Sequence, residues 1–300
     1  MTIIDAHSHI GSILYPGGGS LIFREGIEFP PSAGLQLAYE KALFRETPYM
    51  RGVNKLFPMI SVNCERGRNF AATLENFRES LLATGIERCV CAPVAPNNTC
   101  KDMLAAGHAD GRIIAFTSPD FTVNDTSDKL SQDLTGAAGV KIHPILQEVE
   151  ADSAKVMEAV DLASAHNKPV LLHAGRACYY TTREKKKRFS DFAGIIGIER
   201  LIAAFPRVKF IVGHAGLGEI ASAIDLLPRH KNAFVDTSFQ PPEAIRALIS
   251  EFGGGRVLFA SDWPYGLRLP AIAAAEEACG DDTALCRAVF HDNAAELLGL

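Results

Sequence analysis

The feature that most constrains this chain is the repeated alternation of short apolar runs with longer amphipathic stretches. Eight runs rich in β-branched and apolar residues are predicted to be strands, and they cover Ile3–His9, Ile86–Pro93, Arg112–Pro119, Ala138–His143, Pro169–His173, Val208–His214, Ala233–Thr237 and Val257–Asp262. Apolar residues at three- and four-residue spacing predict helices between them, among which are Asn69–Thr84, Ser153–His166, Ile198–Phe205 and Pro242–Phe252. Such alternation indicates an α/β fold whose parallel strands are joined by right-handed crossovers.

The number of repeats favours a closed (β/α)₈ TIM barrel. Eight strand-helix units within 300 residues match the usual size of that fold. An open doubly wound sheet is the alternative, but no G-x-G-x-x-G fingerprint follows the first predicted strand. Because 47% of the residues are hydrophobic, the chain can bury one large core, and we expect residues 1–300 to form a single domain.

One connection is much longer than the others. The segment between the first two predicted strands runs from residue 10 to residue 85 and includes the glycine-rich Pro16–Ser20. A connection of this length in a compact domain is typical of a functional lid, although a contact between copies in a homo-oligomer is an equally physical use. We therefore assign residues 12–68 to an insertion after strand 1 with one of these two roles.

Charge and composition restrict the partners that this chain can have. Thirty basic and 35 acidic residues give a net charge of −5, which provides no general attraction to nucleic acid or to an anionic membrane. Polar residues interrupt the N-terminal apolar run, and no apolar stretch is long enough to span a bilayer, so we expect neither a signal peptide nor a membrane segment. The seven cysteines lack zinc-finger spacing and are expected to be reduced. We expect a cytoplasmic protein whose partner is a small-molecule substrate.

Five histidines and one aspartate lie at the C-terminal ends of the predicted strands. They are His7 and His9 on the first strand, His143 on the fourth, His173 on the fifth, His214 on the sixth and Asp262 on the eighth. Barrels build their active sites at this end of the strands. Two positions earlier stand the apolar residues Leu171, Val212 and Ala260, which predict a row that faces the barrel interior. Imidazoles and a carboxylate delivered to one mouth by several strands indicate a metal site rather than core packing.

Two pairs of residues are expected to share a face of their strand. His7 and His9 lie two apart, so both imidazoles should point the same way. Lys141 and His143 have the same spacing on the fourth predicted strand. A lysine that points into a barrel needs a partner or a function. We expect Lys141 and His143 to contact substrate, with Asp5 as one candidate partner for the ammonium group.

These motifs resemble the amidohydrolase superfamily. The likeness rests on D-x-H-x-H in the first predicted strand, H-A-G after the fifth and sixth, and S-D-W-P after the eighth, and it extends from Ile3 to the C-terminal HDNAAELLGL. Within the superfamily the motifs resemble the amidohydrolase-related group that includes aminocarboxymuconate semialdehyde decarboxylase. This resemblance implies one divalent metal ion held by His7, His9, His173 and Asp262, with His214 beside it as a catalytic histidine.

The resemblance leaves the reaction and the metal count open. Members of the superfamily hydrolyse, decarboxylate, hydrate and open lactones. Relatives with two metal ions use a carboxylated lysine on the fourth strand, where Lys141 stands in this sequence. The likeness to the one-metal group favours a single ion, with Lys141 as an ion-pair or substrate contact.

The chemistry of the predicted ligands can be argued independently of the resemblance. Imidazole nitrogens with one carboxylate oxygen suit Zn²⁺ best, with Mn²⁺ and Fe²⁺ as alternatives. Bound Zn²⁺ lowers the pKa of its water to about 7. We expect Asp262 to accept the proton that this water loses, while His214 stabilises the oxyanion that forms on a polarised carbonyl.

We therefore predict a metal-dependent hydrolase that acts on a small amide, ester or lactone. A non-oxidative decarboxylase or hydratase of a small unsaturated carboxylate, using the same metal site, is the main alternative. A catalytically silent barrel used for binding is a third hypothesis, but it gives no physical reason for a complete ligand set.

Aromatic and basic residues follow the fifth and eighth predicted strands. Arg176 with Tyr179 and Tyr180 follows the fifth strand, and Trp263 and Tyr265 follow the eighth. An arginine beside aromatic rings suits a small planar carboxylate, so we expect Arg176 and Trp263 to contact substrate. The basic run Arg183–Arg188 and Arg268 are expected to lie on the surface.

Overall fold

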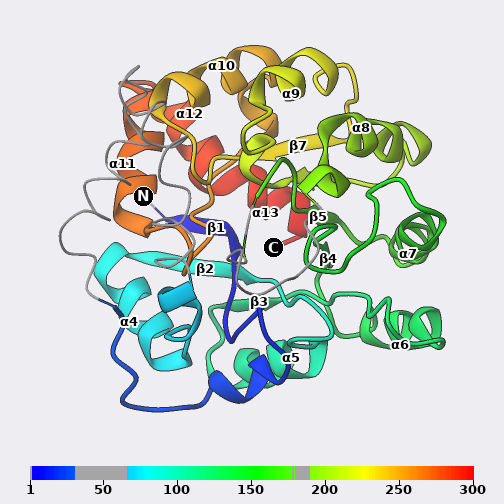
Figure 1. Cartoon of the computed structure of the whole chain (residues 1–300). Coiled ribbons are helices and arrows are strands. Elements are labelled where there is room, and N and C mark those ends of the chain that lie inside the picture. The colour runs from blue at the N-terminus through cyan, green and yellow to red at the C-terminus, as the bar shows by residue number, and fades with distance from the viewer. Residues whose placement is uncertain (1, 31–65, 178, 180–189) are drawn as a thin grey trace.

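The computed structural model of this chain describes residues 2–30, 66–177, 179 and 190–300. Strands and helices alternate along these ranges (Figure 1). The central part of the predicted insertion, residues 31–65, lies outside the described residues, as do Tyr180 and the basic run Arg183–Arg188. The two roles considered for the insertion therefore stay predictions.

The described residues contain eight strands, and every pair of neighbouring strands is parallel. They are β1 (Ile3–Ser8), β2 (Ile86–Cys91), β3 (Ile113–Ala115), β4 (Val140–Ile142), β5 (Val170–Leu172), β6 (Phe210–Val212), β7 (Ala233–Asp236) and β8 (Val257–Leu258). The strand order follows the sequence in two sheets, β1-β2-β3 and β4-β5-β6-β7-β8. Each strand lies within the range predicted for it, and all eight are shorter than predicted.

Backbone hydrogen bonds join the two sheets at both seams. Between β3 and β4, the Lys141 N–H donates to the Thr117 carbonyl at 2.7 Å. Between the segment after β8 and β1, the Asp262 N–H donates to the His7 carbonyl at 2.8 Å. The strand order and these seams give the (β/α)₈ TIM barrel that the repeats predict.

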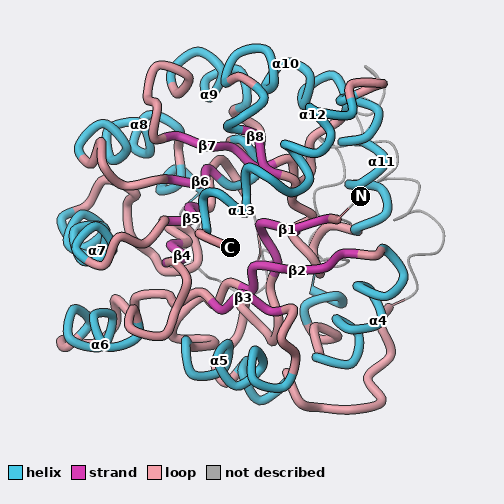
Figure 2. Tube along the Cα trace, turned by 180° about the vertical axis from the view of Figure 1, so that it is seen from behind, coloured by secondary structure: helices cyan, strands magenta, loops and turns pink. Residues whose placement is uncertain are grey.

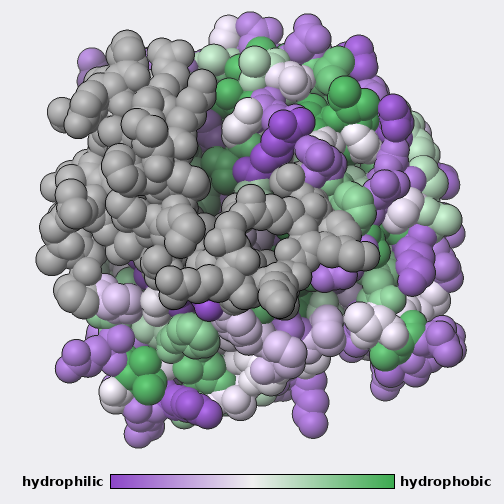
Figure 3. Space-filling model, viewed as in Figure 1, coloured by the Kyte–Doolittle hydropathy of each residue, from purple (hydrophilic) through white to green (hydrophobic). Residues whose placement is uncertain are grey.

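Helices surround the ring of strands, as the view from behind shows (Figure 2). They are α4 (Leu74–Thr84), α5 (Cys100–Ala109), α6 (Thr126–Asp133), α7 (Ala154–Ala165), α8 (Ile195–Ala204), α9 (Ile220–Leu226), α10 (Pro242–Phe252), α11 (Arg268–Cys279), α12 (Thr283–Arg287) and α13 (Asn293–Leu298), with single turns at η1 (Gly18–Leu21), η3 (Ser190–Ala193), η4 (Gly213–Ala215), η5 (Gly254–Arg256) and η6 (Ala288–Asp292). Hydrophilic side chains cover much of the outer face of α7 (Figure 3). None of the helices in the described ranges is long and apolar enough to cross a membrane.

The predicted helix limits agree best where the capping signals are strong. Helix α10 has the predicted bounds, with Pro242 in its first turn, a position where a missing N–H costs nothing. Helix α4 begins at Leu74 rather than at Asn69, because the Thr73 hydroxyl caps it by accepting the Asn76 N–H at 3.2 Å. The side chain of Asn69 instead accepts the Ile13 N–H at 3.1 Å and anchors the loop after β1.

Two apolar layers hold the barrel together. The outer layer lies between strands and helices, and the inner layer fills the barrel with Ile4, Ala6, Val90, Ala92, Ile114, Phe116, Leu171, Ile211 and Leu258. Ala294 and Leu297 of α13 complete the inner layer, and α13 lies across the ring of strands in Figure 2. Asn293 Nδ2, at the start of α13, donates to the carbonyls of Gly254 and Val257, which lie before β8 and at its first residue, so α13 closes the end where the strands begin. The polar strand ends therefore face the other end.

A bulge in β1 allows both of its histidines to reach that end. Ile4 and Ala6 belong to the inner layer, so strict alternation would place His7 on the outer side. The pairing with β2 shifts after Asp5, where three steps along β1 match two steps along β2. An extra residue of this kind redirects the side chains that follow it. His7 and His9 therefore point the same way, as expected, but they do not continue the alternation of Ile4 and Ala6.

The predicted inward row is wrong at one position. Leu171 belongs to the inner layer as predicted, but Val212 belongs to the outer layer and Ile211 takes the inward place. Strand β6 ends at Val212, and His214 has a left-handed backbone with φ 56°. Alternation therefore stops before His214, which reaches the mouth through a turn.

The expectation that Arg268 lies on the surface is wrong. Its side chain is buried, its Nε lies 3.3 Å from Asp5 Oδ2, and its guanidinium lies over the rings of Phe77 and Trp263 at 4.8 and 5.1 Å. Asp5 is thus the partner of Arg268 beside the β8–β1 seam. It is not the partner of Lys141, which corrects the pairing considered from the sequence.

Replacing Arg268 with alanine should lower the free energy of unfolding by about 3–5 kcal/mol, because the Asp5 carboxylate would remain buried without its partner. Urea denaturation followed by circular dichroism measures this change. Arg200→Ala is the matched control, since Arg200 is exposed and its pair with Asp152 at 3.0 Å should contribute only about 0–1 kcal/mol. Equal effects of the two variants would contradict a structural role for the buried pair.

Candidate metal centre

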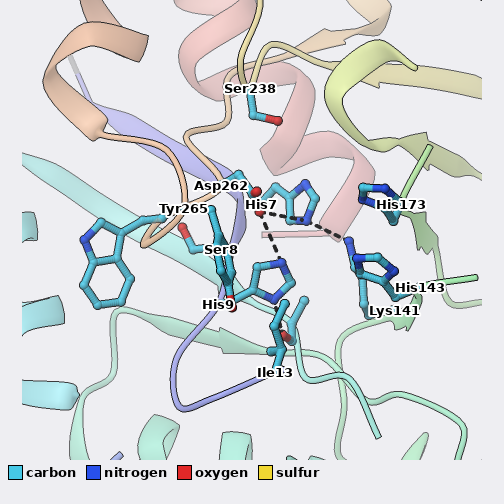
Figure 4. A network of polar contacts seen from close by, with 12 residues as sticks. His7, Ser8, His9, Ile13, Lys141, His143, His173, Ser238, Asp262 and Tyr265 are labelled. Carbon is cyan, nitrogen blue, oxygen red and sulfur yellow. Dashed lines mark hydrogen bonds and ion pairs between the residues drawn. The ribbon is translucent and has the colours of Figure 1, made fainter. Parts of the chain in front are cut away.

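Three side chains from opposite sides of the β8–β1 seam turn toward one another (Figure 4). Asp262 Oδ1 lies 3.2 Å from His9 Nε2 and 3.4 Å from His7 Nε2, and all three residues are buried. Asp262 has a left-handed backbone with φ 55°, which turns its side chain at the strand end. Its Oδ1 makes no hydrogen bond with any residue in the described ranges. The three atoms lie close enough together to hold one metal ion.

The hydrogen bonds of Nδ1 in His7 and His9 show which ring nitrogen carries the proton. His9 Nδ1 donates to the Ala92 carbonyl at 2.6 Å, and His7 Nδ1 donates to Asp236 Oδ2 at 2.8 Å. Carbonyl and carboxylate oxygens only accept, so each neutral ring carries its proton on Nδ1 and directs the lone pair of Nε2 toward Asp262. Two lone pairs and a carboxylate oxygen then face one another without a hydrogen between them. This donor set fits a divalent cation.

Burial keeps the imidazoles of the centre neutral. It is the largest cause that lowers the pKa of His7, His9, His143, His173 and His214. The pKa of His9 falls from 6.5 to about 3. Neutral imidazole is the form that binds metal. Burial raises the pKa of Asp262 well above its usual value, and the charge of Lys141 opposes this rise. A cation bound at Oδ1 would stabilise the ionised carboxylate.

Lys141 approaches the same group from β4. Its Nζ lies 2.7 Å from His7 Nε2, and its side chain is fully buried. Burial lowers the pKa of Lys141 to about 8, although the carboxylates of Asp262 and Asp236 oppose this shift. The structure thus places a primary amine, as predicted, beside the histidines, where it contacts a predicted metal ligand.

A second group of imidazoles continues from His7 across the mouth. The ring centroid of His214 lies 5.0 Å from that of His7 and 5.0 Å from that of His173. His173 Nδ1 lies 3.1 Å from His214 Nε2, and the His173 ring stacks on His143 at 4.0 Å. The Tyr179 hydroxyl lies 3.0 Å from His143 Nε2. Of the predicted ligands, His7, His9 and Asp262 are in direct contact, whereas His173 contacts His214 and His143.

Asp236 at the end of β7 is a site residue that the sequence reasoning missed. Its Oδ2 accepts from His7 Nδ1, and its Oδ1 accepts from the backbone N–H of His214 at 2.9 Å. The residues His7, His214 and Asp236 also form a group with metal-ligand spacing. A signal was available, because Asp236 is the last residue but one of the predicted strand Ala233–Thr237 and so lies near the end where the other site residues gather.

The four predicted substrate contacts divide into two pairs. Lys141 and His143 lie among the histidines. Arg176 is exposed and pairs with Asp191 at 3.4 Å, while Trp263 is buried in the outer layer on the other side of the seam. The geometry therefore does not bring Arg176 or Trp263 to the centre, and substrate contact by any of the four stays a prediction.

A third apolar cluster borders the centre. It comes from the loops after six strands and comprises Ile13, Leu14, Tyr15, Val94, Leu146, Tyr179, Phe239 and Tyr265. The ring of Tyr265 lies 5.8 Å from that of His9, and the ring of Phe239 lies 5.4 Å from that of His214. Apolar surroundings strengthen electrostatic interactions between charged groups in such a site.

Comparisons with known proteins were made on sequence and on structure. A family model described as amidohydrolase matches residues 4–300. Among curated proteins, no sequence matches this chain significantly.

Solved structures of similar fold span the whole chain. An uncharacterized TIM-barrel protein from Bordetella bronchiseptica is 15% identical, with a TM-score of 0.69 and coverage of 100% of this chain and 99% of the other. A 5-carboxyvanillate decarboxylase from Novosphingobium aromaticivorans, complexed with manganese and 4-hydroxy-3-methoxy-5-nitrobenzoic acid, is 14% identical, with a TM-score of 0.64 and coverage of 100% and 96%. A probable 2-pyrone-4,6-dicarboxylic acid hydrolase from Acinetobacter baumannii is 15% identical, with a TM-score of 0.60 and coverage of 100% of both chains. At these identities the likeness shows a shared fold.

The purified protein should carry about one divalent ion per chain, because the Nε2 atoms of His7 and His9 face a carboxylate oxygen that accepts no hydrogen bond from the described part of the chain. Elemental analysis by mass spectrometry measures the stoichiometry. His9→Asn should lower the affinity for the ion by more than the roughly 10–100-fold typical of an outer hydrogen-bond partner. His230→Asn is the control, since His230 pairs with Glu199 at 2.8 Å outside the centre. Wild-type affinity in His9→Asn would contradict the assignment.

Proposed function

Because this chain belongs to the amidohydrolase family, we propose that it is a metal-dependent hydrolase that acts on a small amide, ester or lactone. One observation carries the proposal: the buried Asp262 Oδ1 faces Nε2 of both His7 and His9 and makes no hydrogen bond within the described ranges. His173 would complete the ligand set. We propose Zn²⁺ as the ion, with Mn²⁺ and Fe²⁺ as alternatives.

The residues of the centre suit the transfer of a proton. When bound, a divalent ion supplies a Lewis acid that polarises a carbonyl and lowers the pKa of a water molecule to near neutrality. Burial raises the pKa of the Asp262 carboxyl, so this side chain can hold a proton taken from water and return it to a leaving group. The apolar border formed by Tyr265 and Phe239 limits the access of other water molecules to that proton.

The hydrogen bonds of His214 refine its role. Its Nδ1 lies 2.7 Å from Ser238 Oγ, and Ser238 Oγ donates to Asp236 Oδ1 at 2.5 Å. Ser238 has a single proton, so His214 Nδ1 must be the donor and Nε2 carries the lone pair. Neutral His214 therefore acts first as a proton acceptor. Only its protonated form would donate to an oxyanion, the role expected from the sequence.

A non-oxidative decarboxylase or hydratase of an unsaturated carboxylate is the second candidate. The buried ammonium of Lys141 at the centre favours it, because a substrate carboxylate would find a charged partner there. A protein of the same fold that is named as a 5-carboxyvanillate decarboxylase, and was crystallised with manganese and an aromatic acid, supports it as well. The protein named as a probable 2-pyrone-4,6-dicarboxylic acid hydrolase supports the first candidate.

Product analysis distinguishes the two candidates. The zinc-loaded and manganese-loaded proteins are incubated with a panel of esters, lactones, amides and aromatic or unsaturated carboxylates, and the products are identified by mass spectrometry. Cleavage of an amide, ester or lactone bond with the addition of one water supports the hydrolase, whereas the loss of carbon dioxide supports the decarboxylase. Gain of water across a double bond, with no bond cleaved, identifies a hydratase.

Asp262→Asn should lower turnover by roughly 10²- to 10⁴-fold, because it removes the proton acceptor while keeping one ligand oxygen. Most of the metal should remain bound. Steady-state kinetics and elemental analysis measure both quantities on the same preparation. Asp161→Asn, on the exposed face of α7, is the control and should match the wild type. Near-normal turnover in Asp262→Asn would contradict its role as the base.

His214→Asn should lower turnover by roughly 10²- to 10³-fold, because it removes the proton acceptor whose protonated form would stabilise an oxyanion. The metal content should stay close to that of the wild type, because His214 lies beside the proposed ligands. An empty metal site in this variant alone would place His214 among the ligands and would contradict the proposed division of roles.

A further inference from the structure

Both carboxylate oxygens of Asp236 accept hydrogen bonds from residues of the centre. Oδ2 accepts from His7, and Oδ1 accepts from His214 and from Ser238, which contacts the His214 ring. We infer that Asp236 is a positioning residue that sets the proton positions of His7 and His214 together. This inference rests on the proposed function, because it concerns a proposed metal ligand and a proposed catalytic residue. It is carried by two hydrogen-bonded paths that meet at one buried carboxylate.

The first path runs directly to His7. Asp236 Oδ2 lies 2.8 Å from His7 Nδ1, and both side chains are fully buried. A carboxylate oxygen only accepts hydrogen bonds, so this contact requires the proton of His7 on Nδ1. His7 must therefore accept at Nε2 and donate at Nδ1. The carboxylate of Asp236 is the acceptor that makes this tautomer favourable.

The second path runs to His214 through Ser238. Asp236 Oδ1 accepts from the Ser238 hydroxyl at 2.5 Å and from the Ser238 backbone N–H at 3.0 Å. With its proton used in this way, Ser238 Oγ accepts from His214 Nδ1 at 2.7 Å. The same Oδ1 accepts the His214 backbone N–H at 2.9 Å, which holds the residue in its left-handed conformation. Asp236 thus orients both the backbone and the ring of His214.

An amide in place of this carboxylate cannot satisfy both paths. The side-chain oxygen of an asparagine would face the two backbone N–H groups on the His214 side, which only donate. Its NH₂ group would then face His7 Nδ1 and would require that atom to accept. The proton of His7 would move to Nε2, where it would block metal binding.

The test compares Asp236→Asn with Ser238→Ala. Asp236→Asn should weaken zinc binding roughly 10–100-fold, measured by competition with a chromogenic chelator. Nitrogen-15 NMR of the metal-free proteins should show the proton of His7 on Nδ1 in the wild type and on Nε2 in Asp236→Asn. Ser238→Ala interrupts only the second path, so it should change the tautomer of His214 and leave the His7 tautomer and the zinc affinity as in the wild type.

The outcomes separate this inference from the proposed function. Wild-type zinc affinity and an unchanged His7 tautomer in Asp236→Asn would overturn the positioning role, even if urea denaturation showed a loss of stability. Two ions per wild-type chain, one of them lost in Asp236→Asn, would also overturn it, since Asp236 would then be a ligand. A wild-type protein that binds no ion would refute the proposed function, whereas the NMR comparison would still decide whether Asp236 positions the two histidines.

Discussion

The hydrogen bonds on the outer nitrogens of His7 and His9 are the interactions on which the centre depends. Each ring donates from Nδ1 to an oxygen that only accepts, so its second lone pair must face the mouth of the barrel. Burying Asp262 Oδ1 beside these lone pairs, with no hydrogen-bond donor for it in the described ranges, would cost free energy. The arrangement is therefore suited to hold a cation, and the other charged groups of the mouth are placed around it.

The barrel separates two buried polar systems that start from the same strand. Asp5 pairs with Arg268 beside the seam, on the side of Phe77 and Trp263, while His7 faces the mouth. The bulge in β1 makes this separation within a few residues, because it redirects the side chains after Asp5. The Asp5–Arg268 pair lies beside the seam between the last strand and the first, whereas the histidines at the mouth belong to the candidate metal centre. This explains why the polar residues of a single strand differ so strongly in their partners.

The two candidate reactions use the same groups in different ways. In a hydrolase, Asp262 and neutral His214 handle the proton of an attacking water, and Lys141 adds a positive charge near the developing negative charge. In a decarboxylase, Lys141 would hold a carboxylate before it is lost. In either reaction His214 would begin as a proton acceptor, because the path through Ser238 leaves the lone pair on its Nε2.

The sequence by itself determined the repeat of strands and helices, the barrel class and the set of polar residues at the strand ends, because periodicity and position along a strand are local properties. It did not determine which buried groups meet. Asp5 was considered for Lys141 yet pairs with Arg268, the ring of Trp263 lies in the outer layer, and Val212 faces outward, because a bulge and a left-handed turn interrupt the alternation. The position of Asp236 near a strand end could have been noticed in the sequence. Its role, however, comes from hydrogen bonds with His7 and His214, which belong to other strands and loops of the barrel. Contacts of this kind exist only when the ring of strands closes, so only the tertiary structure decided them.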